Sequence, residues 1–486
     1  MNGNPTTHLR IWQQNLNKSL TSQLHLLNSA RPTDWDALIL QKPWMGQLGT
    51  RASHCWRTLY PNSFFLDNSK TPRSIILINT NISTNTYEQI QFDSPDVTGV
   101  QITQGHHKTI IINVYNDCNH NEALDAVSKF LIHSFPNNLV PDNTHIIFAG
   151  DFNRHHSWWE EDRNAHLTLS ETMIQPLLDI IYRFDFRMAL PPNRPTLRAL
   201  STGNWTRPDN VWCTSHSANL FVTCDTDPRL QGPNTDHVPI LSTLDIPISR
   251  NPPSPSRNFR DTNWEDFTTH LANHLTNSSP PFRLTSKEAF RSALDSINSA
   301  LRETIKTHVP MTKPFPFTKR WWTPELTLMR KKKNRLANLA YKWRGLSEHE
   351  SHLEHRMVSK EYAKLIDSTK KEHWENWLLN ASEKDIWTAS KYTTDPPTDG
   401  GRTRMPTLIL SNPDGTSRRT TSNDEKSEAL ARSFFPPLPF PPLSPTPVTP
   451  NPLTSLNTLL RSRSSTPRTS YPHSKPQALM VSPTLY

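Results

Sequence analysis

The stretch His145-Ile146-Ile147-Phe148-Ala149-Gly150-Asp151-Phe152-Asn153 joins an apolar run to a polar turn. Such a run of β-branched and aromatic residues is typical of a buried strand. A strand that ends in Gly-Asp-x-Asn projects the carboxylate of Asp151 and the carboxamide of Asn153 from a loop onto one site. This pair of side chains can hold a phosphate-bound Mg²⁺ or orient an attacking water.

Further short apolar runs lie on both sides of this stretch and are separated by turns. We predict strands over residues 9–13, 37–41, 74–79, 97–102, 109–115, 145–150, 210–214, 220–224 and 239–244. Apolar residues at helical spacing predict helices over 122–134 and 170–184. Many strands with helices set between them indicate an α/β fold of two packed sheets covered by helices.

Three other polar groups stand at the ends of predicted strands. Thr235-Asp236-His237 precedes one strand, and its acid and imidazole suit contacts with a metal, a water or a phosphoryl oxygen. Asp209 stands at the start of another strand, where a carboxylate can fix the tautomer of a histidine. Asn15 follows the first predicted strand, within Gln13-Gln14-Asn15-Leu16-Asn17. The sequence therefore offers several polar side chains for one site.

Each of these residues also has a purely structural interpretation. Asn15 and Asn153 could cap turns, Tyr115 could be a strand aromatic, and Asp209 and Asp236 could be solvated loop acids. Only the ordered set, with each member at or beside the end of a strand, favours a site.

The ordered set resembles the endonuclease/exonuclease/phosphatase superfamily. The segments QQNLNKS, NVYNDCN, GDFNRHHSWW, NWTRPDNV and TDHVPI look like the apurinic-endonuclease-like domain of a fungal LINE-type (non-LTR) retrotransposon. The resemblance covers about Leu9 to Leu244. It implies a four-layer α/β sandwich with its site at one end of the paired sheets, in a chain that is truncated before the reverse transcriptase.

The resemblance implies catalytic roles for five residues. Asp151 would activate the attacking water, and Asn153 would orient the water and the phosphate. His237 would bind a phosphoryl oxygen, with Asp209 as its orienting partner. Tyr115 would contact the scissile phosphate. These roles describe Mg²⁺-dependent hydrolysis of a DNA phosphodiester that leaves a 3′-hydroxyl.

The resemblance also implies a metal region. Asn15 and Asp236 would help to hold Mg²⁺ or Mn²⁺, and Thr196 would support the site. The principal ligand should be a glutamate in a Gln-Glu-Pro-like turn, but the sequence has Lys42 at that position. An ammonium in place of a carboxylate turns attraction to a dication into repulsion, each on the order of 4 kcal/mol in a partly screened site. We therefore expect impaired metal binding.

The charge of the chain favours an anionic partner. The net charge is +9 over 486 residues, and Lys and Arg gain by displacing counterions from phosphate backbones. DNA is the expected partner of the N-terminal domain, for which we predict the contacts Arg154, His155 and Arg207. A basic balance is also common in proteins that bind no nucleic acid, so charge alone decides little.

Residues beyond 248 differ in composition from the domain over 8–248. We predict a Pro/Ser-rich linker over 249–260, a helical basic connector over 261–395, a weakly structured part over 396–435 and a disordered Pro/Ser-rich tail over 436–486. Thr323-Pro324 predicts the start of a helix. That helix contains Arg330, Lys331, Lys332, Lys333 and Arg335, a run that suits contact with DNA or RNA but is also typical of a solvated helix face.

Other features narrow the class of protein. The four cysteines show neither a Cys-x-x-Cys pair nor a regular framework, so we expect reduced thiols in an intracellular protein that is not secreted. No stretch is apolar enough to span a bilayer. The resemblance implies a nuclear location. Two alternatives to a DNA endonuclease stay open: a catalytically inactive nucleic-acid-binding remnant, and a phosphatase of the same superfamily.

Overall fold

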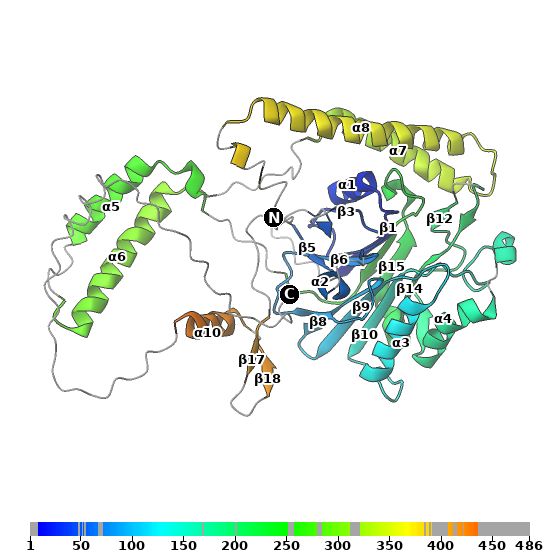
Figure 1. Cartoon of the computed structure of the whole chain (residues 1–486), viewed down its shortest axis with the longest axis horizontal. Coiled ribbons are helices and arrows are strands. Elements are labelled where there is room, and N and C mark those ends of the chain that lie inside the picture. The colour runs from blue at the N-terminus through cyan, green and yellow to red at the C-terminus, as the bar shows by residue number, and fades with distance from the viewer. Residues whose placement is uncertain are drawn as a thin grey trace. The chain divides into compact units, whose positions relative to one another are not determined.

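The structure of the chain is a computed structural model that describes residues 8–46, 49–50, 52, 55–66, 71–167, 170–199, 202–250, 257–278, 284–311, 321–382, 385–387, 390, 407–411, 416–420 and 422–435. The chain divides into two compact units (Figure 1). The first unit combines 1–253 with 316–407, and the second combines 254–315 with 408–486. The tail predicted over 436–486 and residues 251–256 of the predicted linker lie outside the described residues.

Two six-stranded sheets form the centre of the first unit. One sheet has the order β15 (Phe221–Thr226), β16 (Ile240–Leu244), β1 (Leu9–Asn15), β2 (Ala37–Gln41), β6 (Ser74–Asn79) and β5 (Trp56–Leu59). The other has the order β11 (Phe186–Met188), β14 (Asp209–Thr214), β10 (Thr144–Asp151), β9 (His107–Tyr115), β8 (Val97–Gln104) and β7 (Tyr87–Ile90). Both sheets are mixed, because β1 runs parallel to β2 and β9 runs parallel to β10.

Successive side chains of each strand point to opposite faces of the sheet, and both faces are buried. In β10, Ile147 and Ala149 belong to the core between the two sheets. Ile146 and Phe148 point to the opposite face, where they pack with α3 (Glu122–Ser134) and α4 (Glu171–Arg183). Leu38 and Leu40 of β2 likewise pack with α1 (Leu20–Ser29) on the outer face of the first sheet. The layers are therefore helix, sheet, sheet and helix, which confirms the predicted α/β sandwich.

The predicted strands and the two predicted helices of this domain are all present, with ends shifted by at most two residues. The sequence analysis missed β5, β7 and β11. These strands are only three or four residues long and lie at sheet edges. A short edge strand exposes one side and needs no regular apolar pattern, so the alternation signal is weak.

Strand register places polar residues at one end of the sandwich. Asn15 at the end of β1 pairs with Gln41 at the end of β2. In the second sheet, Asp151 pairs with Tyr115 of β9 on one side and with Asp209 of β14 on the other. Gly150, with φ of +152°, allows this arrangement, because a Cβ there would lie 2.0 Å from the carbonyl oxygen of Val114.

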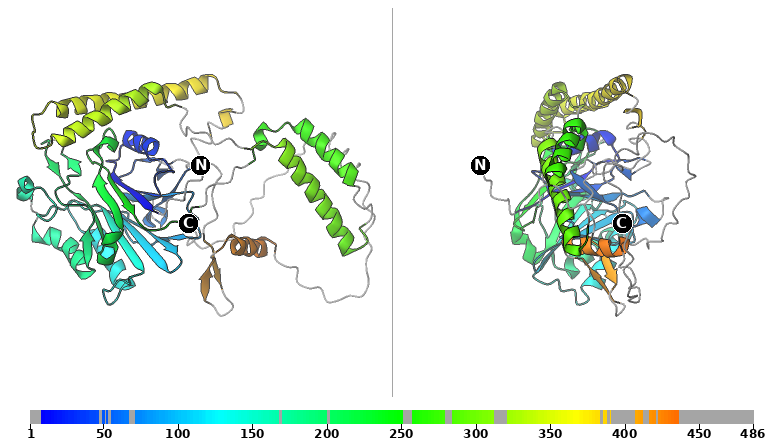
Figure 2. Two further views of the ribbon diagram at one scale, coloured as in Figure 1. Left: turned by 180° about the vertical axis from the view of Figure 1, so that it is seen from behind. Right: turned by 90° about the vertical axis from the view of Figure 1, so that its left-hand side faces the viewer.

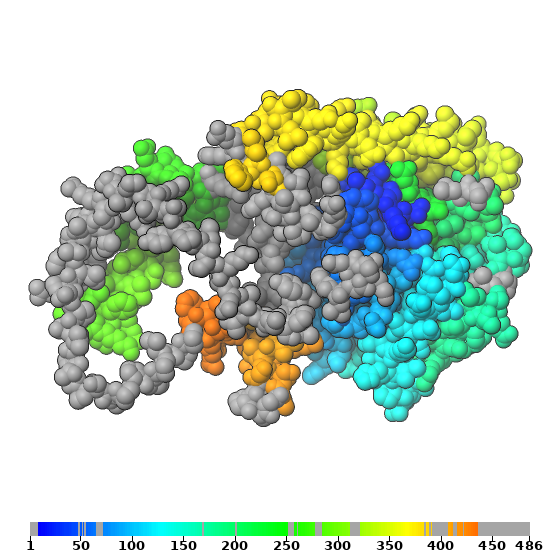
Figure 3. All heavy atoms as spheres, in the orientation of Figure 1, coloured from blue at the N-terminus to red at the C-terminus, as the bar shows by residue number. Residues whose placement is uncertain are grey.

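A helical hairpin completes the first unit. Its helices are α7 (Pro324–Lys342) and α8 (Ser351–Leu379), and Thr323 caps α7 as predicted by accepting a hydrogen bond from Leu326 N. The hairpin lies beside α1 in Figures 1 and 2, and atoms of α8 (yellow) lie against those of α1 (dark blue) in Figure 3. Leu24, Leu326, Tyr362 and Ile366 form the buried seam.

The predicted connector over 261–395 is therefore divided between the two units. The second unit contains the paired helices α5 (Trp264–Ser278) and α6 (Lys287–His308), the hairpin of β17 (Ile409–Ser411) and β18 (Ser417–Arg419), and α10 (Asn423–Phe434). Composition could not reveal this division, because it depends on which apolar surface each helix packs against in the folded chain. Within the described part of the chain, no helix combines the length and the apolar character that crossing a bilayer requires.

Short elements connect the larger ones in the first unit. They are β3 (Met45–Gly46), β4 (Gly49–Thr50), α2 (Ser63–Leu66), the 3₁₀ turns η1 (Asp162–Leu167), η2 (Ser215–Leu220) and η3 (Pro228–Leu230), and the two-stranded ribbon of β12 (Leu197–Arg198) and β13 (Trp205–Thr206). One further 3₁₀ turn, η4 (Phe259–Asp261), precedes α5. The ribbon matters for function because it precedes β14 and brings Thr196 beside Asp209.

Candidate active site

The carboxylate of Asp151 is the centre of the polar cluster at this end of the sandwich. Its side chain is 1% exposed, and both of its oxygens accept hydrogen bonds. Asn15 Nδ2 donates to Oδ2 over 2.7 Å, and the backbone N–H of Asn153 donates to Oδ1 over 3.1 Å. These bonds fix the carboxylate between β1 and the loop after β10.

The loop after β10 is held in an unusual backbone conformation. Asn153 has φ of +49°, a left-handed conformation that asparagine tolerates better than most residues. Its Nδ2 donates to the carbonyl oxygen of Asn116 over 2.7 Å. Asn116 Nδ2 donates in turn to the carbonyl oxygen of Phe152 over 3.1 Å. The Asn153 side chain is therefore engaged by the loop after β9 in this structure.

His237 and Asp209 form a second, linked group. Asp209 Oδ2 lies 2.8 Å from His237 Nδ1 and accepts a hydrogen bond of 2.6 Å from Thr196 Oγ1. His237 Nε2 lies 3.9 Å from Asp151 Oδ2 and 3.9 Å from Asp236 Oδ1. The structure therefore brings together the histidine, its predicted orienting acid and the predicted base, with Asp236 at the edge.

The buried charges shift one another's pKa. Burial and the charge of Asp209 raise the pKa of Asp151 to about 6, although His237, Asn15 and Lys42 oppose the rise. Burial alone would lower the pKa of His237, but the carboxylates of Asp209, Asp151 and Asp236 raise it to about 9. At neutral pH the site therefore pairs a carboxylate that can accept a proton with a charged imidazolium.

Lys42 lies at the same end of the sandwich. Its ammonium is 4.8 Å from the centre of the Tyr115 ring, and the guanidinium of Arg73 is also 4.8 Å from that centre. Burial alone would lower the pKa of Lys42, but the hydrogen bond with Tyr115 and the charge of Asp151 raise it. Lys42 is therefore charged, and a cation stands where the resemblance implies a metal-binding glutamate.

The implied metal region does not fit an ordinary Mg²⁺ site. Asn15 Nδ2 is bonded to Asp151, and Asn15 Oδ1 accepts from the N–H of Asn17 over 2.9 Å. Asp236 is the remaining carboxylate, and the ammonium of Lys42 would repel a dication. Mg²⁺ prefers six oxygen ligands in regular geometry. Lys42 therefore adds a positive charge where the resemblance implies a glutamate ligand.

A neighbouring set of residues could hold a metal. Asp151, Asp209 and His237 each offer a ligand atom within 4.8 Å of the others. Asp209 Oδ1 is buried and accepts no hydrogen bond from the residues that the structure describes. Carboxylate oxygens with an imidazole nitrogen suit Mn²⁺ and similar ions as well as the harder Mg²⁺. The cluster could therefore hold a divalent ion only if His237 lost a proton, since its imidazolium form has no free nitrogen lone pair.

Three of the predicted nucleic-acid contacts, Arg154, Arg207 and Lys333, are buried in this structure. Arg154 is 0% exposed, and its guanidinium donates to backbone carbonyl oxygens, among them those of Met173 and His120. Arg207 is 1% exposed and donates to Leu190 O and Asn210 Oδ1. Lys333 is 0% exposed. A buried cation whose donors face protein oxygens cannot reach a phosphate.

The other predicted contacts lie nearer the surface. His155 is half-buried, and its Nδ1 lies 2.6 Å from Glu160 Oε1. On α7, Lys331, Lys332 and Arg335 are exposed, and Arg330 is half-buried with its guanidinium 5.4 Å from the ring centre of Trp322. The run of five basic residues therefore presents four to the surface and buries the fifth, because only part of a helix faces solvent.

Sequence reasoning missed Arg73 and Asn116. Arg73 forms ion pairs with Asp96 at 2.6 Å and with Asp117, besides its contact with Tyr115. Asn116 connects the loops after β9 and β10. A signal existed for both, since Asn116 directly follows Tyr115 and Arg73 directly precedes a predicted strand.

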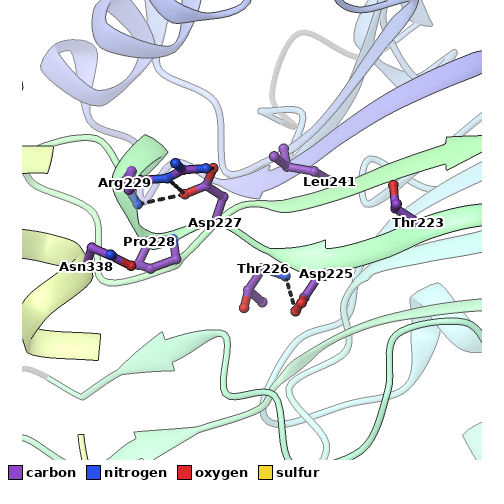
Figure 4. Close-up of a pocket in the computed structure, with 8 residues that line it drawn as sticks. All are labelled: Thr223, Asp225, Thr226, Asp227, Pro228, Arg229, Leu241 and Asn338. Atoms are coloured by element: carbon purple, nitrogen blue, oxygen red, sulfur yellow. Dashed lines mark hydrogen bonds and ion pairs between the residues drawn. The ribbon is translucent and has the colours of Figure 1, made fainter. Parts of the chain in front are cut away.

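A pocket of about 380 Å³ lies away from this cluster. Figure 4 shows its lining by residues of β15, β16 and η3, together with Asn338 of α7. Its two aspartates have partners, since Asp227 pairs with Arg229 at 2.7 Å and Asp225 with Arg194 at 3.5 Å. None of the residues of the Asp151 cluster lines it. The pocket and the Asp151 cluster are therefore separate features of the first unit.

Comparison with known families gives one match within the first unit. Residues 109–241, which include Tyr115, Asp151, Asp209 and His237, match the model of the family described as endonuclease-reverse transcriptase. The match covers 133 of the 486 residues of the chain. The match agrees with the predicted resemblance to the endonuclease/exonuclease/phosphatase superfamily over these residues. No curated protein sequence matches the chain significantly.

Several solved structures are similar to the sandwich of this endonuclease-type domain. The endonuclease domain of TRAS1, a telomere-specific non-LTR retrotransposon, has 16% identity and a TM-score of 0.39, over 49% of this chain and 98% of that one. An AP endonuclease from Leishmania major has 11% identity and a TM-score of 0.40, over 50% and 89%. An AP endonuclease from Archaeoglobus fulgidus has 17% identity and a TM-score of 0.38, over 49% and 100%.

Proposed function

We propose that the first unit is a retrotransposon-derived DNA endonuclease whose divalent-metal step is impaired in this copy by Lys42. The observation that supports the proposal most directly is the buried group of Asp151, Asp209 and His237, whose ligand atoms lie within 4.8 Å of one another. A surface cluster of solvated acids would not be buried or share these hydrogen bonds. The reaction would be in-line attack of water on a DNA phosphodiester, leaving a 3′-hydroxyl.

In this mechanism Asp151 accepts the proton of the attacking water. Asn15 Nδ2 and the backbone N–H of Asn153 hold its two oxygens, so the carboxylate needs no reorganisation when the reaction begins. A pKa of about 6 lets Asp151 be ionised at neutral pH and still take up a proton.

His237 stabilises the charge that develops on a phosphoryl oxygen. Its Nδ1 is engaged by Asp209, which leaves Nε2 to donate to the substrate. Thr196 holds Asp209 and thereby the orientation of the ring. Tyr115, beside the cations Lys42 and Arg73, is suited to contact the same phosphate.

A divalent ion, Mg²⁺ or Mn²⁺, would neutralise charge on the phosphate. Asp151, Asp209 and His237 could hold such an ion only in place of the roles given above, because His237 Nδ1 is engaged by Asp209 and Nε2 would donate to the substrate. Lys42 opposes this binding by charge repulsion. That same observation favours a second candidate function, a protein that binds nucleic acid without cutting it. The exposed Lys331, Lys332 and Arg335 of α7 would supply phosphate contacts in either case.

The test is nicking of supercoiled plasmid in Mg²⁺ or Mn²⁺ by the full chain. A fragment that ends near residue 250 is unsuitable, because α7 and α8 cover buried residues of the domain. Three proteins are compared: native, Lys42→Glu, and Lys42→Glu combined with Asp151→Ala. We expect nicking by Lys42→Glu and silence when Asp151→Ala is added. Nicking by the native protein would remove the impairment from the proposal, and DNA binding without nicking by any of the three would favour the second candidate.

A further inference from the structure

The helix α7 contacts the segment before His237 through the buried amino group of Lys333. Lys333 Nζ donates to the carbonyl oxygens of Arg229, at 3.3 Å, and Gln231. Gln231 Nε2 donates to the carbonyl oxygen of Thr235 over 2.9 Å, and Thr235 Oγ1 accepts from the backbone N–H of His237 over 3.3 Å. A continuous series of hydrogen bonds therefore joins α7 to the backbone of His237.

A second contact of α7 reaches the partner of His237. Tyr341 Oη donates to the carbonyl oxygen of Pro195 over 3.2 Å and lies 3.0 Å from Thr226 Oγ1. The residue after Pro195 is Thr196, whose hydroxyl donates to Asp209 over 2.6 Å. Tyr341 therefore fixes the backbone immediately before the threonine that holds Asp209.

The ring of Tyr341 also packs against residues next to the site. It meets the indole of Trp205 edge-on, with ring centres 5.2 Å apart and planes at 88°. Tyr341, Trp205 and Val238 form one buried cluster. Val238 directly follows His237, and its N–H donates to the carbonyl oxygen of Thr196 over 2.7 Å. The ring of Tyr341 therefore supports both the segment that contains His237 and the segment that contains Thr196.

We propose that α7 supports the nuclease site, with Tyr341 and Lys333 as positioning residues for the segments that present His237 and Asp209. The inference rests on the proposed function for its catalytic consequence but not for its structural one. Neither side chain touches the reacting atoms. Lys333 acts through hydrogen bonds to main-chain carbonyl oxygens, and Tyr341 acts mainly through the packing of its ring, with its hydrogen bond to Pro195 O as an addition. Both hold segments that would otherwise be loops, and loops carry functional groups accurately only when a rigid scaffold holds them.

The structural test is site-resolved amide hydrogen exchange on the full chain. The experiment compares native protein with Tyr341→Phe, Tyr341→Ala and the control Leu328→Ala. Leu328 also lies on α7 and is 67% exposed. We expect Tyr341→Ala to speed exchange of the Thr196 and Val238 amides about tenfold or more, while Ile111 and Ile147 in the central strands keep their protection. Tyr341→Phe, which keeps the ring, should give a smaller increase. Equal exchange in Tyr341→Ala and Leu328→Ala would overturn the proposal.

The catalytic test uses whichever background nicks DNA, native or Lys42→Glu. Tyr341→Ala should lower kcat on the order of 10- to 100-fold, because small displacements of catalytic groups are costly. KM for DNA should stay within about twofold, since the proposed DNA contacts are elsewhere, and Tyr341→Phe should recover most of kcat. An unchanged kcat in Tyr341→Ala overturns the proposal. If neither background nicks, the proposed function fails, and the exchange experiment alone then decides whether α7 positions these segments.

Discussion

The ammonium of Lys42 lies 4.8 Å from the centre of the Tyr115 ring, and Tyr115 is the strand partner of Asp151. A fixed positive charge therefore stands beside the carboxylate at the centre of the site. A glutamate at this position would instead add negative charge at the same end of the sandwich. The identity of this one side chain sets how strongly the site attracts a dication.

Replacing Lys42 should therefore change metal affinity in steps. Lys42→Met removes the repulsion, and Lys42→Glu adds a ligand, so Mn²⁺ affinity of the full chain should rise from native to Lys42→Met to Lys42→Glu. Each unit of charge contributes on the order of 4 kcal/mol at contact in a partly screened site and less at a longer distance, so a rise of at least about tenfold per step is expected. Titration calorimetry measures the affinity. Lys332→Met, which removes an exposed charge on α7, is the matched control, and equal affinities in all variants would refute the repulsion argument.

Thr196 is expected to affect turnover more than binding. Thr196→Val removes the hydroxyl that donates to Asp209 over 2.6 Å and keeps the shape of the side chain. The loss of such an orienting partner typically costs 10- to 100-fold in activity. In a background that nicks DNA, kcat should fall by about this factor, while Thr196→Ser restores it. A fall in Thr196→Val that Thr196→Ser does not reverse would mean that packing, and not the hydroxyl, is responsible.

The sequence predicted the parts of the fold that depend on local pattern. The strand ending at Asp151 was visible because its apolar run and its polar turn are contiguous, and the order of the motifs brought Asp209 and His237 into the same hypothesis. Their actual meeting is a property of strand register, since Asp151 pairs with Asp209 across the sheet. The family match over 109–241 supports that part of the prediction.

Residue type alone could not show which cations face solvent. Arg154 and Arg207 follow polar motifs and look like phosphate contacts, yet each is used to hold loops together by donating to main-chain oxygens. The positioning role that we propose for α7 was also not visible in the sequence. Tyr341 is 146 residues from Pro195 in the chain, and no local pattern connects two residues so far apart.

The basic face of α7 gives a test of nucleic-acid binding that includes its own control. Lys331→Ala, Lys332→Ala and Arg335→Ala should each weaken binding of duplex DNA and reduce the steepness of log K against log salt by about one unit at most, if each contacts one phosphate. Lys333→Met should leave that slope unchanged, because its ammonium is buried and bonded to carbonyl oxygens. Fluorescence anisotropy at several salt concentrations measures the slope. A change in slope for Lys333→Met equal to that for Lys332→Ala would show that the burial argument is wrong.

Lys333 also predicts how the stability of the first unit depends on pH. Burial, together with the charge of Arg330, lowers its pKa from 10.5 to about 7, although Asp227 opposes the shift. Between these two values the unfolded chain binds a proton at Lys333 and the folded chain does not. The free energy of unfolding should therefore rise with pH from about 7 to about 10.5, by at most about 1.4 kcal/mol per pH unit from this group. Below pH 7 both states are protonated, and the penalty for burying the charge is present in full.

Urea unfolding at pH 6, 8 and 10 measures the effect as a difference between native protein and Lys333→Met, so that cysteines and tyrosines that titrate in both proteins cancel. The variant loses two carbonyl contacts at every pH, and its disadvantage should grow as pH rises, whereas Lys332→Met should follow the native curve. A difference between native and Lys333→Met that stays constant from pH 6 to pH 10 would show that Lys333 keeps an ordinary pKa in the folded protein.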